Sequence, residues 1–423
     1  MSQHFNALET RSPQQREAEL MAALPAQIAN AQNNSAAFAE ILKGVDASSI
    51  NSRSALAQLP VTRKYELLER QQALRASRPG ADPFGGFSTI GWKGMLRSSG
   101  AKRVYQSPGP IYEPEGHAVD YWRAGRAMAA AGFEAGDLVH NCFSYHLTPG
   151  AWIMESGAHA LGCTVIPGGV GNTEQQLAAI ADLCPQAYSG TPSFLKILIE
   201  KAGEAGQKLS ITKALVSGEA CPPSLRDWFT QHGVAAYQCY ATADVGLIAY
   251  ETASREGLVL DEGVIVEIVR PGTGEPVPEG EVGEVVVTVL NPDYPLIRFG
   301  TGDLSAVLPG ACPTGRTNTR IKGWMGRADQ TTKVRGMFVH PGQVNEVVKR
   351  FAEVAKARLV VTGEMANDQM CLQVEASNAP PDLAQRVADA VRDVTKLRAD
   401  VQVVGLGTLP NDGKVIEDAR SYK

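Results

Sequence analysis

One carboxylate in the sequence stands where an apolar segment runs into a glycine-rich turn. The segment YPLIRF (294–299) is followed by GTGD, so Asp303 closes a turn that contains Gly300 and Gly302. A carboxylate at a strand end can accept two charge-assisted hydrogen bonds from a ribose diol. Aspartate is also common in turns for purely local reasons. Taken alone, the segment supports two interpretations of Asp303 equally: a nucleotide contact or an aspartate that caps a turn.

A second group of charged residues lies in the segment WMGRADQTTKVRGMFVHP (324–341). Arg327 is followed two positions later by Asp329, and Gly336 interrupts the apolar run behind them. An ordinary surface turn would explain these residues one by one. Their occurrence in order behind Asp303 is more specific than either segment alone.

Near the end of the chain, Lys414 follows Gly413 in the segment LPNDGKVIED (409–418). A lysine ammonium is a compact point charge on a flexible side chain. Such a charge can stabilise the negative charge that develops on phosphate and carboxylate oxygens in a transition state. The alternative is a solvated lysine in a glycine turn.

These three segments, in this order, resemble the ribose-binding, hinge and catalytic-lysine motifs of the adenylate-forming enzymes. The resemblance implies a large domain that binds the nucleotide and a small C-terminal domain that rotates to deliver the lysine. The family usually has an arginine between this lysine and the next acid, where Ile416 and Glu417 stand here, so only the lysine is assigned. The implied roles are ribose ligand for Asp303, nucleotide contact for Arg327, hinge for Asp329, lining of a thiol-substrate tunnel for Gly336, and catalysis for Lys414.

Segments in the middle of the chain resemble landmarks of one branch of this superfamily, the phenylacetate-coenzyme A ligases. They read GCTVIPGGVGNTEQQ, SGTPSF and SGEAC, and with an early Leu-Pro pair the likeness runs from about residue 55 to the end. In that branch the Gly-Glu-Ala turn flanks adenine. In isolation, the same segments would be interpreted as turns at strand ends. The resemblance assigns Gly218, Glu219 and Ala220 to the nucleotide site and Gly168 and Gly169 to the substrate pocket.

The phosphate loop departs from the family pattern, which is a run of Ser, Thr and Gly closed by Gly-Lys-Pro. Backbone N–H groups and hydroxyls of such a loop bind the triphosphate, but no such run occurs here. The candidates are SSGAKR (98–103) and, at a better distance from Trp122, QSPGP (106–110), which assigns Ser107 and Gly109. Because prolines lack an N–H donor, the second candidate would hold phosphates through fewer contacts.

The segment YATAD (240–244) departs in a similar way, since the family has Tyr-Gly, any residue, Thr or Ser, and then Glu. Asp244 can still bind Mg²⁺, because magnesium takes hard oxygen ligands from carboxylates of either length. Ala243 replaces a hydroxyl that would touch phosphate. These changes are consistent with an altered nucleotide geometry or with the loss of ordinary ATP use. Tyr240, Ala241 and Thr242 are assigned to the nucleotide site.

An acyl pocket is expected where an apolar strand at 137–143 ends. The side chains of Phe143, Tyr145 and His146 follow this strand, and ligands of α/β sheets bind at the carboxyl ends of the strands. His146 has an alternative role as a satisfied structural histidine.

The elements that would position these residues alternate between helix and strand. Helical patterns at 117–132 and 149–162 are interleaved with strand patterns at 137–143 and 163–168, and the alternation continues to about residue 218. Such alternation indicates parallel β-α-β units with buried strands. The predicted fold class is therefore α/β.

Other regions differ in character. Residues 35–74 predict helices, whereas 77–116 are rich in Gly, Pro and Ser with one short β-like patch. From about residue 257, short β-rich runs predict an antiparallel β subdomain. The last ninety or so residues read strand, helix, strand, strand, helix, strand, an α+β module large enough to fold alone. We expect an N-terminal domain at 1–328 and a C-terminal lid domain at 329–423.

Composition limits the function classes. The formal net charge of −5 provides no broad basic surface, so nucleic acid is not an expected partner. The seven cysteines form no C-x-x-C pair, which fits a reducing cytoplasm better than a zinc or disulfide scaffold. No apolar stretch reaches the length of a membrane span, and the N-terminus lacks a signal-peptide pattern.

The expected function is a two-step ligase that uses ATP, Mg²⁺ and coenzyme A to activate a small, compact carboxylic acid. The thiol acceptor, the aromatic or similarly compact character of the acid and a homodimer are implied by the resemblance only. Two rivals share the fold: a non-catalytic or regulatory paralogue that binds a nucleotide or acyl-coenzyme A, and an adenylating enzyme with another acceptor. A dinucleotide oxidoreductase would need a G-x-G-x-x-G turn between strand and helix, and no suitable one is present.

Overall fold

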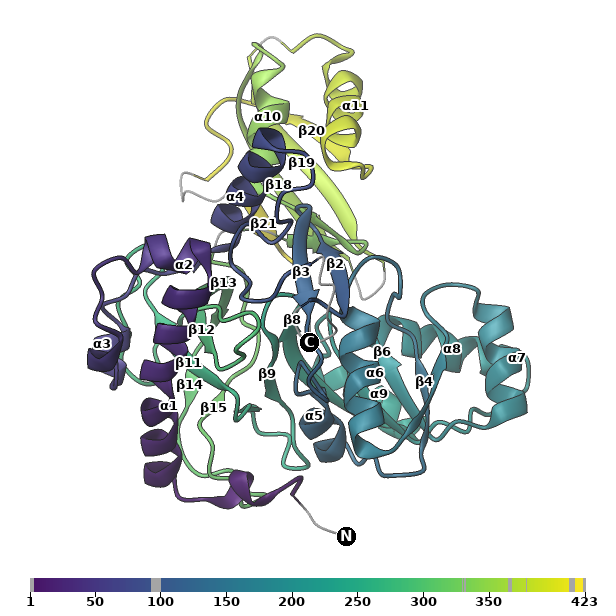
Figure 1. Ribbon diagram of the computed structural model, residues 1–423. Helices are drawn as coiled ribbons and strands as arrows, with labels where there is room; N and C mark the ends of the chain where they lie inside the picture. The colour runs from purple at the N-terminus through teal and green to yellow at the C-terminus, as the bar shows by residue number, and fades with distance from the viewer. Residues whose placement is uncertain are drawn as a thin grey trace. The chain divides into compact units, whose positions relative to one another are not determined.

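The computed structural model describes residues 4–92, 100–328, 330, 332–363, 367–377, 379–410 and 415–420. The chain divides into two units, Met1–Met325 and Gly326–Lys423. The division falls slightly before the boundary expected between residues 328 and 329. The predicted α/β class is confirmed by the sheets and helices of the large unit (Figure 1).

A nine-stranded sheet forms the centre of the large unit, in the order β14-β15-β10-β9-β8-β7-β6-β4-β5. The strands from β5 to β8 are parallel, as the helix–strand alternation predicts. The remaining pairs of this sheet are antiparallel. The parallel strands are β4 (Leu138–Asn141), β5 (Thr164–Pro167), β6 (Ala187–Gly190), β7 (Lys213–Val216) and β8 (Ala235–Thr242); the others are β9 (Gly246–Tyr250), β10 (Leu258–Leu260), β14 (Val307–Leu308) and β15 (Arg320–Ile321).

Helices connect the parallel strands and cover the sheet (Figure 1). Apolar side chains of two of them pack with residues of the central strands in one core cluster. The helix expected at 117–132 is shorter than predicted, because Asp120 and Arg123 adopt left-handed backbone conformations with φ of 49° and 65°. The carboxylate of Asp120 then accepts the N–H of Gly125 in the first turn. The helices are α5 (Ala124–Ala130), α6 (Gly150–Leu161), α7 (Thr173–Leu183), α8 (Pro192–Glu204) and α9 (Pro223–Gln231).

A second sheet, in the order β1-β13-β12-β11, forms the β subdomain that the sequence predicts. Its apolar face packs with α1 in one buried cluster that includes Leu24 and Ile28. The buried Arg298 donates to both carboxylate oxygens of Glu267 within this subdomain. The elements are β1 (Thr62–Arg63), β11 (Val264–Val269), β12 (Gly283–Val289) and β13 (Phe299–Ser305), with α1 (Pro13–Asn34), α2 (Ala36–Ile41), α3 (Arg53–Leu56), α4 (Lys64–Ser77) and the 3-10 turns η1 (Ala7–Thr10) and η2 (Ala47–Ser49).

The Gly- and Pro-rich region contains more regular structure than the single β-like patch that the sequence suggests. Its described part forms an antiparallel hairpin of β2 (Arg103–Ser107) and β3 (Ile111–Glu115). The side-chain amide of Gln71 on α4 donates to the carbonyl of Tyr112 and accepts its N–H. A tertiary contact from a helix therefore stabilises a hairpin that composition alone does not indicate.

The small unit is an α+β module around a sheet with the order β20-β19-β18-β21. The segment expected as one strand around 333–339 is instead a hairpin of β16 and β17. Its turn consists of Arg335 and Gly336, both with positive φ, as two-residue hairpin turns of type I′ require. The elements are β16 (Thr332–Val334), β17 (Met337–Val339), α10 (Pro341–Lys349), β18 (Val354–Thr362), β19 (Gln369–Ala376), α11 (Leu383–Thr395), β20 (Asp400–Val404) and β21 (Ile416–Asp418).

One side chain links two distant segments of the small unit. The side-chain oxygen of Gln330 accepts the N–H of Val415 at 2.7 Å and the N–H of Ile416 at 3.3 Å. The strand that begins at Ile416 then pairs in parallel with β18. Residues that directly follow Lys414 in sequence are thus attached both to the sheet and to Gln330. In the part of the chain that the structure describes, no helix combines the length and apolar character needed to cross a membrane.

Burial of most cysteines leads to a prediction about their reactivity. Burial raises the pKa of the Cys221 and Cys239 thiols to about 12, whereas Cys184 is exposed. Because the thiolate is the nucleophile, we expect iodoacetamide at pH 8 to label Cys184 at least about 10³-fold faster than Cys239. Peptide mass spectrometry over time measures this, with urea-unfolded protein as the control in which both react. Equal labelling of both residues in the folded protein would contradict the burial of Cys239.

Candidate active site

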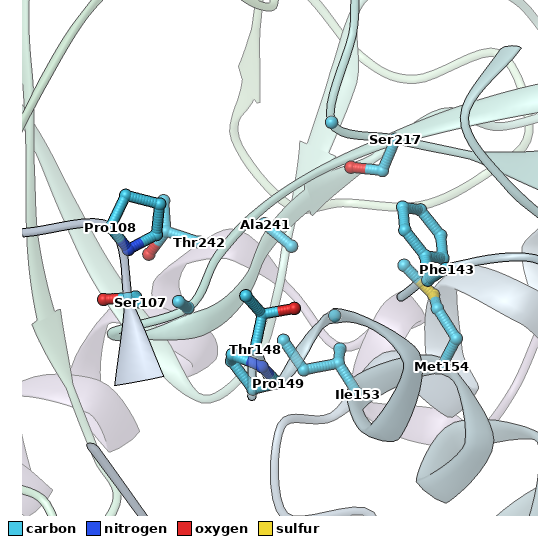
Figure 2. A pocket seen from close by; sticks show the side chains of 13 residues that line it. Ser107, Pro108, Phe143, Thr148, Pro149, Ile153, Met154, Ser217, Ala241 and Thr242 are labelled. Carbon is cyan, nitrogen blue, oxygen red and sulfur yellow. The ribbon is translucent and has the colours of Figure 1, made fainter. Parts of the chain in front are cut away.

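A cavity of about 180 Å³ lies in the large unit at the carboxyl ends of β4, β7 and β8. Figure 2 shows Phe143 and Met154 at one end of it, and Ser107, Pro108 and Thr242 at the other. The Phe143 end is predominantly apolar. The lining residues come from the β2–β3 hairpin, the loop after β4, the start of α6, the residues after β7 and the end of β8: Ser107, Pro108, Phe143, Thr148, Pro149, Gly150, Ile153, Met154, Ser217, Gly218, Ala241, Thr242 and Ala243.

The structure brings together five residues that the sequence assigns to the nucleotide or the acyl substrate. Four of them lie at the carboxyl ends of parallel strands, which meet at one edge of the sheet, and Ser107 ends a strand of the β2–β3 hairpin. Gly218 lies in a left-handed conformation, with φ of 80°, two residues after the end of β7. The five residues are Ser107, Phe143, Gly218, Ala241 and Thr242.

The predicted ribose ligand is held by two donors. The hydroxyl of Tyr240 donates to Asp303 Oδ2 at 2.8 Å, and the indole N–H of Trp324 donates to Asp303 Oδ1 at 3.1 Å. Asp303 was expected in a turn after a strand, but it lies within β13, which runs from Phe299 to Ser305, and it is half-buried there. A carboxylate oxygen can accept more than one hydrogen bond, as contact with a ribose diol would require. The family motifs at 240 and 303 are therefore adjacent in space.

A buried group of charges lies beside the cavity lining. The ammonium of Lys64 contacts Asp244 Oδ2 at 3.0 Å, and Asp244 contacts a second carboxyl group, that of Glu113 on β3. Ser107 donates its hydroxyl to Glu113 Oε1 at 2.8 Å. Burial raises the pKa of Glu113 well above its ordinary value, and the negative charge of Asp244 raises it further. The hydroxyl expected to bind phosphate is thus engaged by an acid that the sequence analysis did not identify.

The donor set of this group fits Mg²⁺ only in part. Carboxylate oxygens are suitable hard ligands, and Asp244 Oδ1 is a buried oxygen for which no hydrogen-bond donor is found among the described residues. Within the same residues, no group of three or more His, Cys, Asp and Glu side chains is placed so that it could hold a metal ion. Remaining positions around a magnesium ion would therefore belong to phosphate oxygens and water.

Several predicted pocket residues do not line the cavity. Tyr145 accepts an N–H from Asn141 and donates its hydroxyl to Glu155 at 2.7 Å. His146 is exposed. A side chain at position 168 would collide with Gln176 and His140, so close packing is sufficient to explain glycine at Gly168, and its neighbour Gly169 also lies outside the lining. Their roles in binding the acid remain predictions.

The other predicted nucleotide residues also lie outside the lining. Glu219 is exposed and accepts the hydroxyl of Ser193 at 2.5 Å. Gly109 occupies the turn of the β2–β3 hairpin, next to the lining residue Pro108. Ala220 follows Glu219 and is half-buried. In the small unit, Arg327 is half-buried and Gly336 is exposed. Asp329 and Lys414 fall outside the described residues.

Two helix residues that form much of the apolar end were not predicted from the sequence. Ile153 and Met154 lie in the first turns of α6, directly after the loop that carries Phe143. Their position behind a predicted strand end was a usable signal, because the loop and helix after a parallel strand border the ligand site. The inward orientation of Glu113 had no comparable signal, since its strand was not predicted.

Comparison with known proteins agrees with this arrangement. A family model described as AMP-binding enzyme matches residues 120–289, and a model described as AMP-binding enzyme C-terminal domain matches residues 336–418. Fold and site thus define an AMP-binding enzyme. Among characterised relatives, phenylacetate-coenzyme A ligase of Thermus thermophilus is 32% identical over 353 residues, which cover 79% of this chain and 75% of the relative. The enzyme of that name from Escherichia coli is 28% identical over 318 residues, covering 70% of this chain and 72% of the relative.

Solved structures support the fold. The structure of 2-hydroxyisobutyryl-CoA ligase with 2-HIB-AMP and CoA superposes with a TM-score of 0.81 at 24% identity, covering 100% of this chain and 93% of the other. An o-succinylbenzoate CoA synthetase from Bacillus subtilis superposes with a TM-score of 0.56 at 15% identity, covering 74% and 68% of the two chains. The chain belongs to the phenylacetate-coenzyme A ligase-like branch of the adenylate-forming enzymes.

Proposed function

We propose that the chain is an AMP-forming acid–thiol ligase that joins a small carboxylic acid to coenzyme A. In the first step a carboxylate oxygen bonds to the α-phosphorus of ATP, the bond to the β-phosphate breaks, and pyrophosphate leaves. In the second step the thiol sulfur of coenzyme A bonds to the acyl carbon and AMP leaves. Asp244 would contribute to holding the Mg²⁺ that accompanies ATP, and Lys414 would stabilise the charge that develops in the first step. A cytoplasmic location and a homodimer belong to the same proposal and rest on the sequence and the resemblance alone.

The observation that carries this proposal is the two-ended cavity at the carboxyl ends of the parallel strands (Figure 2). Phe143, Ile153 and Met154 would hold the apolar body of an acid. The acid's carboxylate would then face the opposite end, where Ser107 and Thr242 lie. Its volume of about 180 Å³ is below the roughly 300–1,000 Å³ of sites for drug-sized ligands. A short-chain or monocyclic aromatic acid is therefore the proposed substrate.

The test is a pyrophosphate-release screen over aryl and short-chain acids, with products identified by mass spectrometry. We expect an acyl adenylate without coenzyme A and an acyl-coenzyme A when it is present. If the acyl adenylate forms but no thioester forms with coenzyme A, and no product forms with carrier proteins or amines either, only the first step of the proposed reaction would stand. Absence of pyrophosphate release with every acid, combined with measurable nucleotide binding, would favour the regulatory paralogue.

A specific observation keeps the regulatory paralogue as the second candidate. The hydroxyl of Ser107 is engaged by Glu113, Ala243 has no hydroxyl, and the hairpin turn contains two prolines that lack N–H donors. These features reduce the number of groups available to bind phosphates. Isothermal titration with ATP and with acyl-coenzyme A separates the two candidates, because a regulatory protein would bind without turnover.

Enlarging the apolar end should change the preference for acids. Phe143→Ala removes the aromatic ring and its apolar contact with the acid. We therefore expect the kcat/KM for the preferred acid to fall by about 10–100-fold. The kcat/KM for a bulkier acid should fall less or rise. The ratio of kcat/KM for the two acids measures this and cancels any loss of folded enzyme. Leu183→Ala, at an exposed position on α7, is the control. An unchanged ratio in Phe143→Ala would remove Phe143 from the acyl site.

A further inference from the structure

Two carboxyl groups meet beside the cavity in an unusual setting. Glu113 and Asp244 are 2% and 7% exposed, and the two groups contact each other. One oxygen of each, Glu113 Oε2 and Asp244 Oδ1, is buried and receives no N–H or hydroxyl donor from the described residues. Like charges buried in contact are unfavourable, so this arrangement requires a positive charge or a proton between the two groups.

Lys64 supplies a positive charge at one edge of this pair. Lys64 contacts the other oxygen of Asp244, and its side chain is 38% exposed. Ser107 occupies the remaining oxygen of Glu113. The two oxygens without a donor, Glu113 Oε2 and Asp244 Oδ1, therefore belong to two residues that contact each other. Lys64 and Ser107 contact the other oxygen of each carboxyl group, so they do not satisfy these two. The acids carry one more potential charge than Lys64 neutralises.

We propose that Glu113 is a second carboxylate ligand, together with Asp244, for the Mg²⁺ ion that accompanies ATP, and that Lys64 partly neutralises the pair when no ion is bound. Magnesium in ATP-dependent sites is commonly held by one or two carboxylates plus phosphate oxygens and water. The lining residues Ser107 and Ala243 place the pair next to the cavity: the first is hydrogen-bonded to Glu113 and the second precedes Asp244 in sequence. The inference rests on the proposed function for the source of the ion.

The competing explanation is a shared proton between the two acids, with no ion. The two explanations differ in the effect of Lys64. Removing its charge makes a metal site more negative and strengthens cation binding. A proton-sharing pair without a metal site would bind no ion in either form.

The test measures Mn²⁺ binding to the nucleotide-free full-length chain by electron paramagnetic resonance, with Mg²⁺ as competitor. We expect one ion per wild-type chain, displaced by Mg²⁺. Affinity should fall at least about tenfold in Glu113→Gln and in Asp244→Asn, since each loses a ligand charge, and rise severalfold in Lys64→Gln. The control is Glu115→Gln on the same strand, because Glu115 is already paired with Arg103 and Lys102. The Mn²⁺ affinity of this variant should equal that of the wild type.

Wild-type protein that binds no Mn²⁺, or Glu113→Gln that binds it as tightly as wild type, would overturn the inference. Should Glu113→Gln fail to fold, the wild-type titration and the rise in Lys64→Gln still decide, because Lys64 is partly exposed. Failure of the proposed function would give a different result from failure of this inference. The wild type would then bind Mn²⁺, and the substitutions would change its Mn²⁺ affinity as expected, but no acid would lead to pyrophosphate release.

Discussion

Replacing Lys414 by alanine is expected to lower the rate of acyl-adenylate formation by about 10²–10³-fold, the effect of removing one preorganised charge from a transition state. Binding of ATP should change little, because the ribose and adenine contacts assigned to the large unit are retained. The measurement is pre-steady-state pyrophosphate release with saturating ATP and acid. The expectation rests on the Gly-Lys motif, since this lysine lies outside the described residues.

Two controls separate catalysis from a general loss of positive charge. Lys349→Ala removes an exposed lysine from the end of α10 in the same unit and should leave the rate unchanged. Conversion of a chemically prepared acyl adenylate to the thioester should be far less affected than adenylation in Lys414→Ala. Adenylation at the wild-type rate in this variant would show that the lysine has no catalytic role.

The second large effect is expected when Asp303 is replaced, and it should appear in the kcat/KM for ATP. Asp303→Ala removes a charged acceptor of two ribose hydrogen bonds, each worth about 1.5–3 kcal/mol. Allowing for partial replacement by water, we expect kcat/KM for ATP to fall by about 10²–10³-fold. Initial rates at varied ATP and fixed acid measure this.

Tyr240→Phe is the matched comparison, because it removes one donor from Asp303 Oδ2 and leaves the carboxylate in place. Its kcat/KM for ATP should fall by about tenfold or less. Thermal unfolding of Asp303→Ala addresses the simpler alternative that Asp303 has a purely structural role in β13. A lower melting temperature with an unchanged kcat/KM for ATP would support that alternative.

The order of helix and strand patterns along the chain was enough to predict the class of fold. Buried parallel strands require helices between them, and this requirement appears in sequence as alternating apolar patterns, so β4 to β8 and α6 to α8 were predictable. The left-handed residues Asp120 and Arg123, which shorten α5, had no pattern to reveal them. The turn at Arg335 and Gly336 was similarly hidden, because Thr332–Val334 and Met337–Val339 are both rich in strand-forming residues and together look like one strand.

The site was predictable where an assignment depended on position after a strand. Phe143, Gly218 and Thr242 follow parallel strands, and the topology brings them to one cavity. Glu113 could not be found in this way, because its orientation depends on a hairpin that Gln71 holds from another helix. His146 illustrates the opposite case: it lies two positions from the lining residue Thr148 and is nevertheless exposed, because local sequence does not determine which way a loop turns.

The contact of Gln330 with Val415 and Ile416 has a mechanical consequence. Gln330 adjoins Asp329, the predicted pivot, while Val415 adjoins Lys414, so the two ends of the proposed motion share one side chain. Because Ile416 begins the strand that pairs with β18, Gln330, Val415 and the sheet would turn as one body about the predicted pivot. Shortening the side chain at position 330 is expected to let residues 415 and 416 move independently of residue 330.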